Sequence, residues 1–288
     1  MFSFVGFQIE NKIHLGIESL LDPTNNAVYT PDFRLLKRLA PGLTGTYHMM
    51  SECEEIMSGA LSDCSITEIT FSSNMTHICS NAFFYCAVKQ INLTGIVCEN
   101  KAFQEAGLES VVIPGEWRVT PEYIFGGCDR LKWAEIEEGI VEIGYGTFCN
   151  SKLSEGVRWA DSIEKIGDCA FQYSKIPDMG LPDKNLKIIG KKAFESCLSF
   201  TEIIIPACVR LIDDYAYSTC SGARRAILES CNTHWTPISF FSIYEYLQPT
   251  CIATRYFTPD TSYYRGEDVL MELFQHSCYS IVVLSGLF

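Results

Sequence analysis

The apolar residues of this chain return at a fixed interval over most of its 288 residues. One aromatic position recurs at spacings of 20, 22, 23, 23, 23 and 23 residues, and Leu61 extends the series backwards by 22. The aromatic members are Phe83, Phe103, Phe125, Phe148, Phe171, Phe194 and Tyr217. Self-similarity at one period is the signature of a repeat architecture, so the fold has to be built from stacked copies of one unit.

Two further columns accompany the aromatic one. The residue before the aromatic is small or β-branched in every copy: Ala60, Ala82, Ala102, Ile124, Thr147, Ala170, Ala193 and Ala216. Five residues before it, six copies have isoleucine: Ile56, Ile78, Ile143, Ile166, Ile189 and Ile212. Because one such unit is too small to bury its own apolar side, the copies must stack and share a continuous core.

Each copy opens on a short alternation of apolar and polar residues, which predicts a strand. The clearest segments are ITEITF from Ile66, VKQINL from Val88, LESVVIP from Leu108, LKWAEI from Leu131 and FTEIIIP from Phe200. Equivalent strands are expected to pair into a parallel sheet on one face, with short turns or helical segments on the other. The fold class predicted is therefore an α/β repeat solenoid. Arg158 and the segment 178–180 depart from the pattern and weaken the fifth and sixth strands.

The copy FTEIIIPACVRLIDDYAYSTC, from Phe200 to Cys220, resembles the repeat of the BspA-like (Treponema pallidum-type) leucine-rich repeat family almost position by position. The resemblance covers about residues 43–231, in about eight copies. It implies a leucine-rich-repeat solenoid. Proteins with similar repeats are often surface or secreted molecules implicated in adhesion to host components and other cells, so the resemblance also implies a binding or adhesion role.

The ends of the chain are expected to cap the solenoid, because terminal repeats expose apolar edges. Residues 1–42 form the predicted N-terminal cap, and residues 232–288 a C-terminal cap or small module. In the first, Thr30-Pro31-Asp32 predicts the start of a helix that ends at Pro41-Gly42. Its apolar residues are Phe33, Leu35, Leu36 and Leu39. A second helix is predicted from Glu267 to about His276.

The chain has 14 cysteines, and the largest group occupies one repeat position, three residues after the aromatic. This group, Cys64, Cys86, Cys128, Cys197 and Cys220, is interpreted as small buried hydrophobes. No metal site is predicted, because the sequence has no C-x-x-C pair and no histidine placed to complete a four-ligand zinc site. No cofactor is predicted either.

Charge and motifs narrow the function further. The formal net charge of −13 argues against binding nucleic acid, which needs clustered basic residues. The five histidines fall in no catalytic motif, so no catalytic residues are assigned and the chain is not expected to be an enzyme. No apolar run is long enough to insert into a membrane. The first residues do not resemble a secretion signal, which favours the cytoplasm, with export to the surface by an unconventional route as the alternative.

Strand alternation also predicts which side chains face outward. The expected binding residues are Trp133, Glu135, Glu137, Glu155, Val157, Trp159, Asp178, Glu202 and Ile204, with Ser110 and Val112 beside them. Two tryptophans among carboxylates predict a protein partner with a basic or amphipathic surface. Two alternatives stay open. The tryptophans could cover the edges of an irregular sheet near Arg158, and the chain could be an intracellular scaffold or adaptor.

Overall fold

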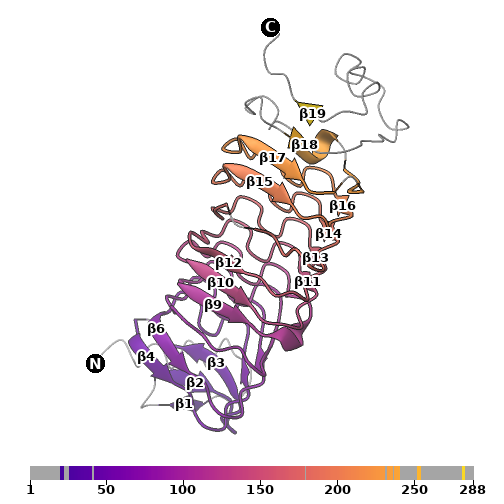
Figure 1. Cartoon of the computed structure of the whole chain (residues 1–288). Coiled ribbons are helices and arrows are strands. Elements are labelled where there is room, and N and C mark those ends of the chain that lie inside the picture. Colours follow the sequence, from indigo (N-terminus) through magenta and orange to yellow (C-terminus); the bar gives the residue numbers. More distant parts are fainter. Residues whose placement is uncertain are drawn as a thin grey trace.

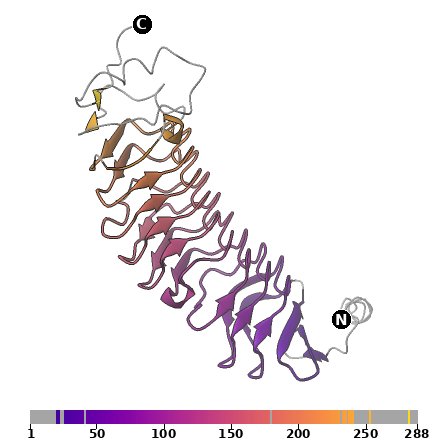
Figure 2. The same ribbon diagram turned by 90° about the vertical axis from the view of Figure 1, so that its right-hand side faces the viewer.

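The protein is an elongated, curved solenoid in which successive turns of the chain stack on one another (Figures 1 and 2). The computed structural model describes residues 20–22, 26–40, 42–178, 180–230, 232–235, 237–240, 252–253 and 281–282. The predicted repeat solenoid is confirmed.

One line of parallel strands is formed by the alternating segments. β4 (Thr44–His48) pairs with β6 (Ser65–Thr70), and β10 (Trp133–Ile136) pairs with both β9 (Ser110–Ile113) and β12 (Gly156–Arg158). Further along, β15 (Glu202–Ile205) pairs with β17 (Arg225–Leu228). Neither the segment after Val88 nor the described residues around Asp178 form a strand, so this line of strands is interrupted twice.

A second line of parallel strands runs along the isoleucine column, which the sequence had indicated only as core. Each strand has two residues, and the first sheet contains β5 (Glu55–Ile56), β7 (His77–Ile78) and β8 (Val97–Cys98). The second contains β11 (Glu142–Ile143), β13 (Lys165–Ile166), β14 (Ile188–Ile189) and β16 (Leu211–Ile212). Repeats such as the one that contains β10 and β11 therefore contribute a strand to each of two lines instead of one.

The predicted helical segments are wrong, because turns occupy the rest of each repeat. The only helices among the described residues are two short 3-10 segments, η1 (Gly115–Trp117) and η2 (Pro237–Phe240). In every copy the residues two before and two after the aromatic have left-handed φ angles, as Cys169 (56°) and Tyr173 (60°) do around Phe171. An α-helix needs negative φ at each position, so two left-handed residues four apart prevent one.

Backbone hydrogen bonds join these turns to the next repeat. Around Phe171, the N–H groups of Cys169, Phe171 and Tyr173 donate to carbonyls of the following turn, at 2.9, 2.7 and 2.8 Å. The bond of the aromatic residue recurs in every copy from Leu61 to Tyr217. The turn side is therefore tied together by its backbone, and its polar groups are satisfied without helices.

The aromatic column forms the centre of the core. Its residues from Phe83 to Tyr217 are at most 1% exposed, and neighbouring rings stack with centroids 4.7 to 5.8 Å apart. Phe240 continues the stack, 5.4 Å from Tyr217. Burying one phenylalanine contributes about 1.5–3 kcal/mol, so this column is a main source of stability.

The cysteine column is buried as predicted, and the structure adds a reason for the residue type. The thiols of Cys128, Cys197 and Cys220 each donate to the carbonyl of the aromatic residue one turn earlier, at 3.3, 3.0 and 3.0 Å. Ser151 takes the same position after Phe148 and donates to the equivalent carbonyl at 2.6 Å. A small side chain fits this position, and where it carries a donor it can bond to that carbonyl; Ala106 fills the position after Phe103 without a donor. All five cysteines of the column are free thiols in the structure.

The predicted helix over residues 30–42 is wrong, because this segment is part of a sheet. β1 (Leu20–Asp22), β2 (Ala27–Tyr29) and β3 (Leu35–Leu39) run antiparallel, and β3 then pairs parallel with β5. Phe33 has a left-handed φ of 60°, and its N–H donates to the Thr30 carbonyl at 2.9 Å, which closes a turn where a helix was expected. The sheet formed by β1, β2 and β3 covers the first repeat.

Near the C-terminus, β18 (Ile252–Ala253) and β19 (Ile281–Val282) pair antiparallel. The helix predicted from Glu267 lies outside the described residues. In the part of the chain that the structure describes, no helix has the length and apolar character needed to cross a bilayer.

Candidate partner-binding face

In the middle of the first strand line, five side chains lie on the outward side of the sheet, two of them exposed and three, including Trp133, half-buried. Trp133 lies opposite Ser110 in β9 and Gly156 in β12, and Glu135 lies opposite Val112 and Arg158. These five side chains, Ser110, Val112, Trp133, Glu135 and Arg158, are called the tryptophan face below. The residues that alternate with them, such as Ala134 and Ile136, are buried. Four of the five were expected at outward positions, and Arg158 was not.

Three members of the tryptophan face form one cluster. The guanidinium of Arg158 lies over the Trp133 ring, 4.7 Å from its centroid. The same guanidinium donates to the Glu135 carboxylate at 3.1 Å, although the two side chains are 70% and 43% exposed. Stacking on the ring and bonding to the carboxylate hold the arginine in one orientation. The indole thus lies on the outward side of the sheet, beside the ion pair of Arg158 and Glu135.

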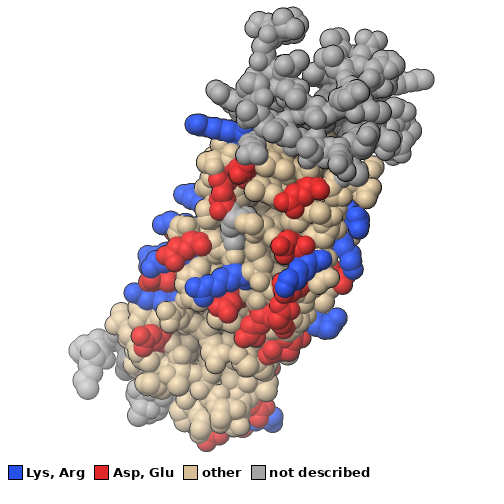
Figure 3. Space-filling model, viewed as in Figure 1, with Lys and Arg blue, Asp and Glu red and all other residues tan. Residues whose placement is uncertain are grey.

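A second charge cluster lies at the edge of this face. Lys89 and Lys132 contact the two oxygens of Glu109, at 3.3 and 2.8 Å. Lys132 first, and Lys89 after it, hold the pKa of Glu109 below its ordinary value. The three residues come from three successive turns, so the ion pairs run along the solenoid axis. Basic and acidic side chains are interspersed on the side of the molecule that Figure 3 shows.

The expectation that Val157 points outward is wrong, because Val157 is 4% exposed. The fifth strand is shifted by one residue relative to the alternation inferred from the sequence. Leu153 is buried with a φ of 43°, and Gly156 takes the place opposite Trp133. The shift turns Arg158 outward. The shift could have been predicted from the length of the repeat, because the residue 23 positions after Trp133 is Gly156.

Trp159 has a different role from Trp133. Both are half-buried, but the Trp159 ring packs edge-on against Phe171 at 5.7 Å, and its indole N–H donates to the Gly180 carbonyl at 2.8 Å. It covers the core at the turn where no sixth strand forms. For this residue the structure favours the alternative that the sequence left open, a tryptophan covering an irregular sheet edge.

The other expected binding residues lie around the tryptophan face or beyond it. Glu137 and Glu155 are exposed, and Glu137 accepts a hydrogen bond from the Gly115 N–H at 3.3 Å. Asp178 is exposed and accepts from the N–H groups of Thr201 and Glu202, at 2.7 and 3.2 Å. It caps the start of β15 where a strand partner is missing.

Two further expected residues, Glu202 and Ile204, lie on β15. Glu202 is half-buried and Ile204 is 40% exposed. Because the strand line is interrupted between β12 and β15, these two belong to a separate patch and not to the tryptophan face.

The recurrence of the columns agrees with a comparison against models of known families. The model described as BspA type leucine rich repeat region matches in six copies, over residues 54–176, 96–224 and 154–247. Together these matches span residues 54–247, which is more than half of the chain. The chain belongs to the BspA type leucine-rich repeat family. The family assignment covers the tryptophan face and both lines of strands around it.

A solved structure shows a similar fold. The chain is similar to a leucine-rich repeat protein from Bacteroides ovatus ATCC 8483, with a TM-score of 0.50 and 16% identity over 75% of this chain and 70% of that one. It is also similar to a leucine rich cell surface protein from Faecalibacterium prausnitzii A2-165, at a TM-score of 0.40 and 15% identity over 80% of this chain and 93% of that one. At these identities the likeness concerns the fold alone. No curated protein matches the sequence.

Proposed function

We propose that this BspA type repeat protein binds a protein partner on the tryptophan face and has no catalytic role. The observation that supports this proposal most is the arrangement around Trp133 on the outward side of the sheet. Arg158 stacks on its ring and also donates a hydrogen bond to Glu135 beside it. Tryptophan and arginine are the residues most enriched among those that dominate protein interfaces. An aromatic anchor that is already oriented loses little conformational freedom when a partner binds.

The chemistry of the face favours an amphipathic partner. Val112 is 37% exposed next to the cluster and adds apolar surface. The net charge of −13 attracts a basic protein at long range, which raises the association rate more than the final affinity. We therefore propose a partner that inserts an apolar side chain beside the indole and places basic groups toward the surrounding carboxylates.

Affinity capture tests this proposal. The wild-type chain, Trp133→Ala and Val119→Ala are immobilised separately, and the proteins retained from cell extract are quantified. Val119 is 48% exposed but lies on the second strand line, so it is a matched control. The proposal requires a protein that the wild type and Val119→Ala retain and that Trp133→Ala loses. If every retained protein binds Trp133→Ala as well as the wild type, the face is not the binding site.

Where the protein acts is a separate proposal. The resemblance of its repeats to adhesion proteins supports a surface or secreted module, and a cytoplasmic scaffold is the alternative. Cell fractionation, combined with protease treatment of intact cells, distinguishes the two. Protection from external protease together with recovery in the cytosol supports the scaffold, and cleavage on intact cells supports the adhesion-type module.

A further inference from the structure

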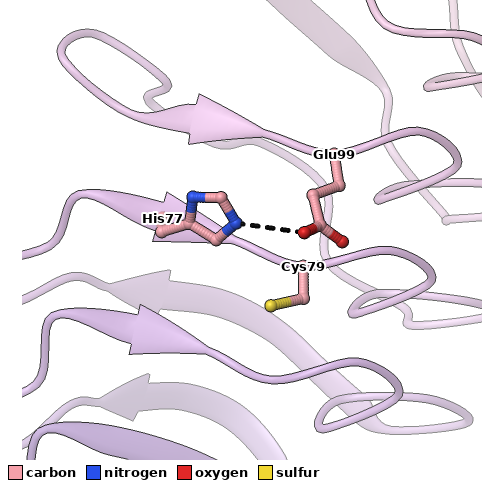
Figure 4. A group of neighbouring side chains, drawn as sticks. All are labelled: His77, Cys79 and Glu99. Atoms are coloured by element: carbon pink, nitrogen blue, oxygen red, sulfur yellow. Dashed lines mark hydrogen bonds and ion pairs between the residues drawn. The ribbon is translucent and has the colours of Figure 1, made fainter.

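Three side chains of metal-binding types meet on the second strand line, away from the tryptophan face (Figure 4). They are His77 and Cys79, from β7 and the residue after it, and Glu99, which follows β8. In the parallel pairing, Ile78 lies opposite Cys98, so Cys79 and Glu99 are neighbours across the ladder. His77 and Cys79 are two residues apart and therefore point to the same side of their strand.

The distances between the donor atoms suit a single ion. The donor atoms of the three residues all lie within 4.8 Å of one another. His77 Nε2 and Glu99 Oε1 are 3.3 Å apart. Two ligands of one tetrahedral Zn²⁺, each about 2.0–2.1 Å from the metal, also stand about 3.3 Å apart. The Cys79 sulfur lies within 4.8 Å of the donor atoms of both His77 and Glu99, and a zinc-bound sulfur stands about 2.3 Å from the metal.

A neighbouring carboxylate and a supporting hydrogen bond adjoin the group. The carboxylate is that of Glu55, which contacts Cys79 but is not among the donors that all lie within 4.8 Å of one another. The Cys79 thiol lies 3.2 Å from Glu55 Oε1, one turn earlier, in β5. On the other side, the N–H of Ser80 donates to Glu99 Oε2 at 2.7 Å and fixes the orientation of the Glu99 carboxylate. Hydrogen bonds of this kind to the ligands are a regular part of metal sites.

The repeat itself does not require these residues. Three later copies have glycine at the position of Cys79, namely Gly144, Gly167 and Gly190. At Gly144 an added Cβ would lie 2.1 Å from the Thr120 carbonyl oxygen, so that copy has no room for a side chain. In the second sheet of the same line, the position of His77 is taken by Glu142, Lys165 or Ile188. The cysteine and histidine are thus features of this copy and not of the repeat.

We propose that His77, Cys79 and Glu99, with Glu55 as the fourth ligand, bind one Zn²⁺ ion. The nitrogen, sulfur and oxygen donors are those that zinc takes. On binding, the Cys79 thiol gives its proton to solvent and the thiolate joins the metal. Because the ligands come from three successive turns, the ion would link those turns, and four protein ligands leave no open position for catalysis.

No metal site was predicted from the sequence, because the proposed ligands are not all close together along the chain. The proposed ligands are separated by about one repeat, 22 residues from Glu55 to His77 and 22 from His77 to Glu99. In a solenoid, residues one repeat apart lie side by side on neighbouring turns. The signal in the sequence was therefore periodic, with unusual residues at matching positions of successive copies.

The test uses the untagged full-length protein with zinc chloride in titration calorimetry, and with cobalt chloride in absorption spectroscopy. Cys79→Ser and His77→Gln remove one ligand each with little change in size. Cys149→Ser is the matched control, since Cys149 is also half-buried and belongs to no such group among the described residues. Circular dichroism verifies that all variants are folded.

We expect one zinc ion per wild-type chain, with affinity at least tenfold weaker in Cys79→Ser and in His77→Gln and unchanged in Cys149→Ser. Cobalt should give a thiolate-to-metal charge-transfer band in the wild type. Cys79→Ser should abolish this band, and Cys149→Ser should keep it. Zinc should also raise the melting temperature of the wild type and of Cys149→Ser, and raise that of Cys79→Ser by less at the same zinc concentration. A wild-type protein that binds no zinc, or ligand variants that bind it as tightly as the wild type, would overturn the proposal.

Discussion

The guanidinium of Arg158 and the indole of Trp133 stack across two neighbouring strands, 4.7 Å from the group's central carbon to the ring centroid. The contact exists because the fifth strand is shifted by one residue, which buries Val157 and turns Arg158 outward. An irregularity of the repeat thus creates the feature that distinguishes this face from the others.

Replacing Arg158 with alanine should separate binding from stability. The side chain is 70% exposed, so its ion pair with Glu135 contributes little to folding, and the melting temperature should change by less than about 3 °C. Partner affinity should fall, because the indole loses the group that orients it. Arg158→Lys keeps the charge without the planar stack and should restore only part of the affinity. A large loss of melting temperature would assign Arg158 to the fold instead.

Replacing Phe148 with alanine should be among the most destabilising single changes. Its ring is fully buried between Phe125 and Phe171, at 5.7 and 5.3 Å, and the cavity left behind cannot collapse without disturbing both neighbours. We expect the free energy of unfolding to fall by about 3–5 kcal/mol in urea titrations. Leu198→Ala, at a site that is 61% exposed, is the control and should change it little. Equal effects of the two substitutions would contradict a core built on the aromatic stack.

Replacing Tyr217 with phenylalanine should stabilise the protein. Tyr217 is the last repeat residue of the column before Phe240, and its buried hydroxyl has no hydrogen-bond partner among the residues that the structure describes. A buried, unsatisfied hydroxyl costs about 1–3 kcal/mol, which the substitution removes while the ring stays in place. Thermal unfolding should show a higher melting temperature. A lower one would mean that the hydroxyl is satisfied by a bound water.

The buried thiols should make stability fall at alkaline pH. Burial raises the pKa of Cys86 and of Cys197 from its ordinary value near 9 to about 12. Above pH 9 the unfolded chain loses these protons and the folded chain keeps them. The free energy of unfolding should therefore drop by up to about 1.4 kcal/mol per pH unit for each such thiol between pH 9 and 12.

Serine substitutions test the assignment of this pH dependence. Ser151 shows that a serine at this repeat position keeps the hydrogen bond to the preceding turn. Cys86→Ser and Cys197→Ser should therefore fold. Their free energy of unfolding should depend less on pH between 8 and 9.5 than that of the wild type. An unchanged pH dependence in the double variant would show that other groups cause it.

The repeat could be predicted from the sequence because its columns are long and regular. The burial of Phe171 or Cys197 follows from their position in a column, whatever the details of the turn. The helix over residues 30–42 could not be rejected, since the spacing of Leu35, Leu36 and Leu39 suits a helix as well as a strand. The segment is a strand because β3 pairs with β2 and β5. A local sequence pattern does not show which strands will pair.

The candidate site was predicted only in part for a related reason. Trp133 and Glu135 were placed correctly because the fourth copy keeps the regular alternation. Val157 was predicted on the wrong side of its strand. Leu153 and Gly156 have left-handed φ angles, and the backbone there accommodates one more residue before the strand than the alternation assumed. The two-residue strands along the isoleucine column are too short to produce an alternation at all, so the second line of strands and the group around His77 became evident only in three dimensions.

The affinity of Trp133→Ala for the captured partner tests the proposed binding face most directly. Wild type, Trp133→Ala and Val119→Ala are compared by surface plasmon resonance at one salt concentration, with circular dichroism as the check on folding. Trp133→Ala should bind at least about 30-fold more weakly, as expected when an interface residue contributing 2 kcal/mol or more is removed. Val119→Ala should bind as the wild type does. Equal affinities of Trp133→Ala and the wild type would contradict binding on the tryptophan face.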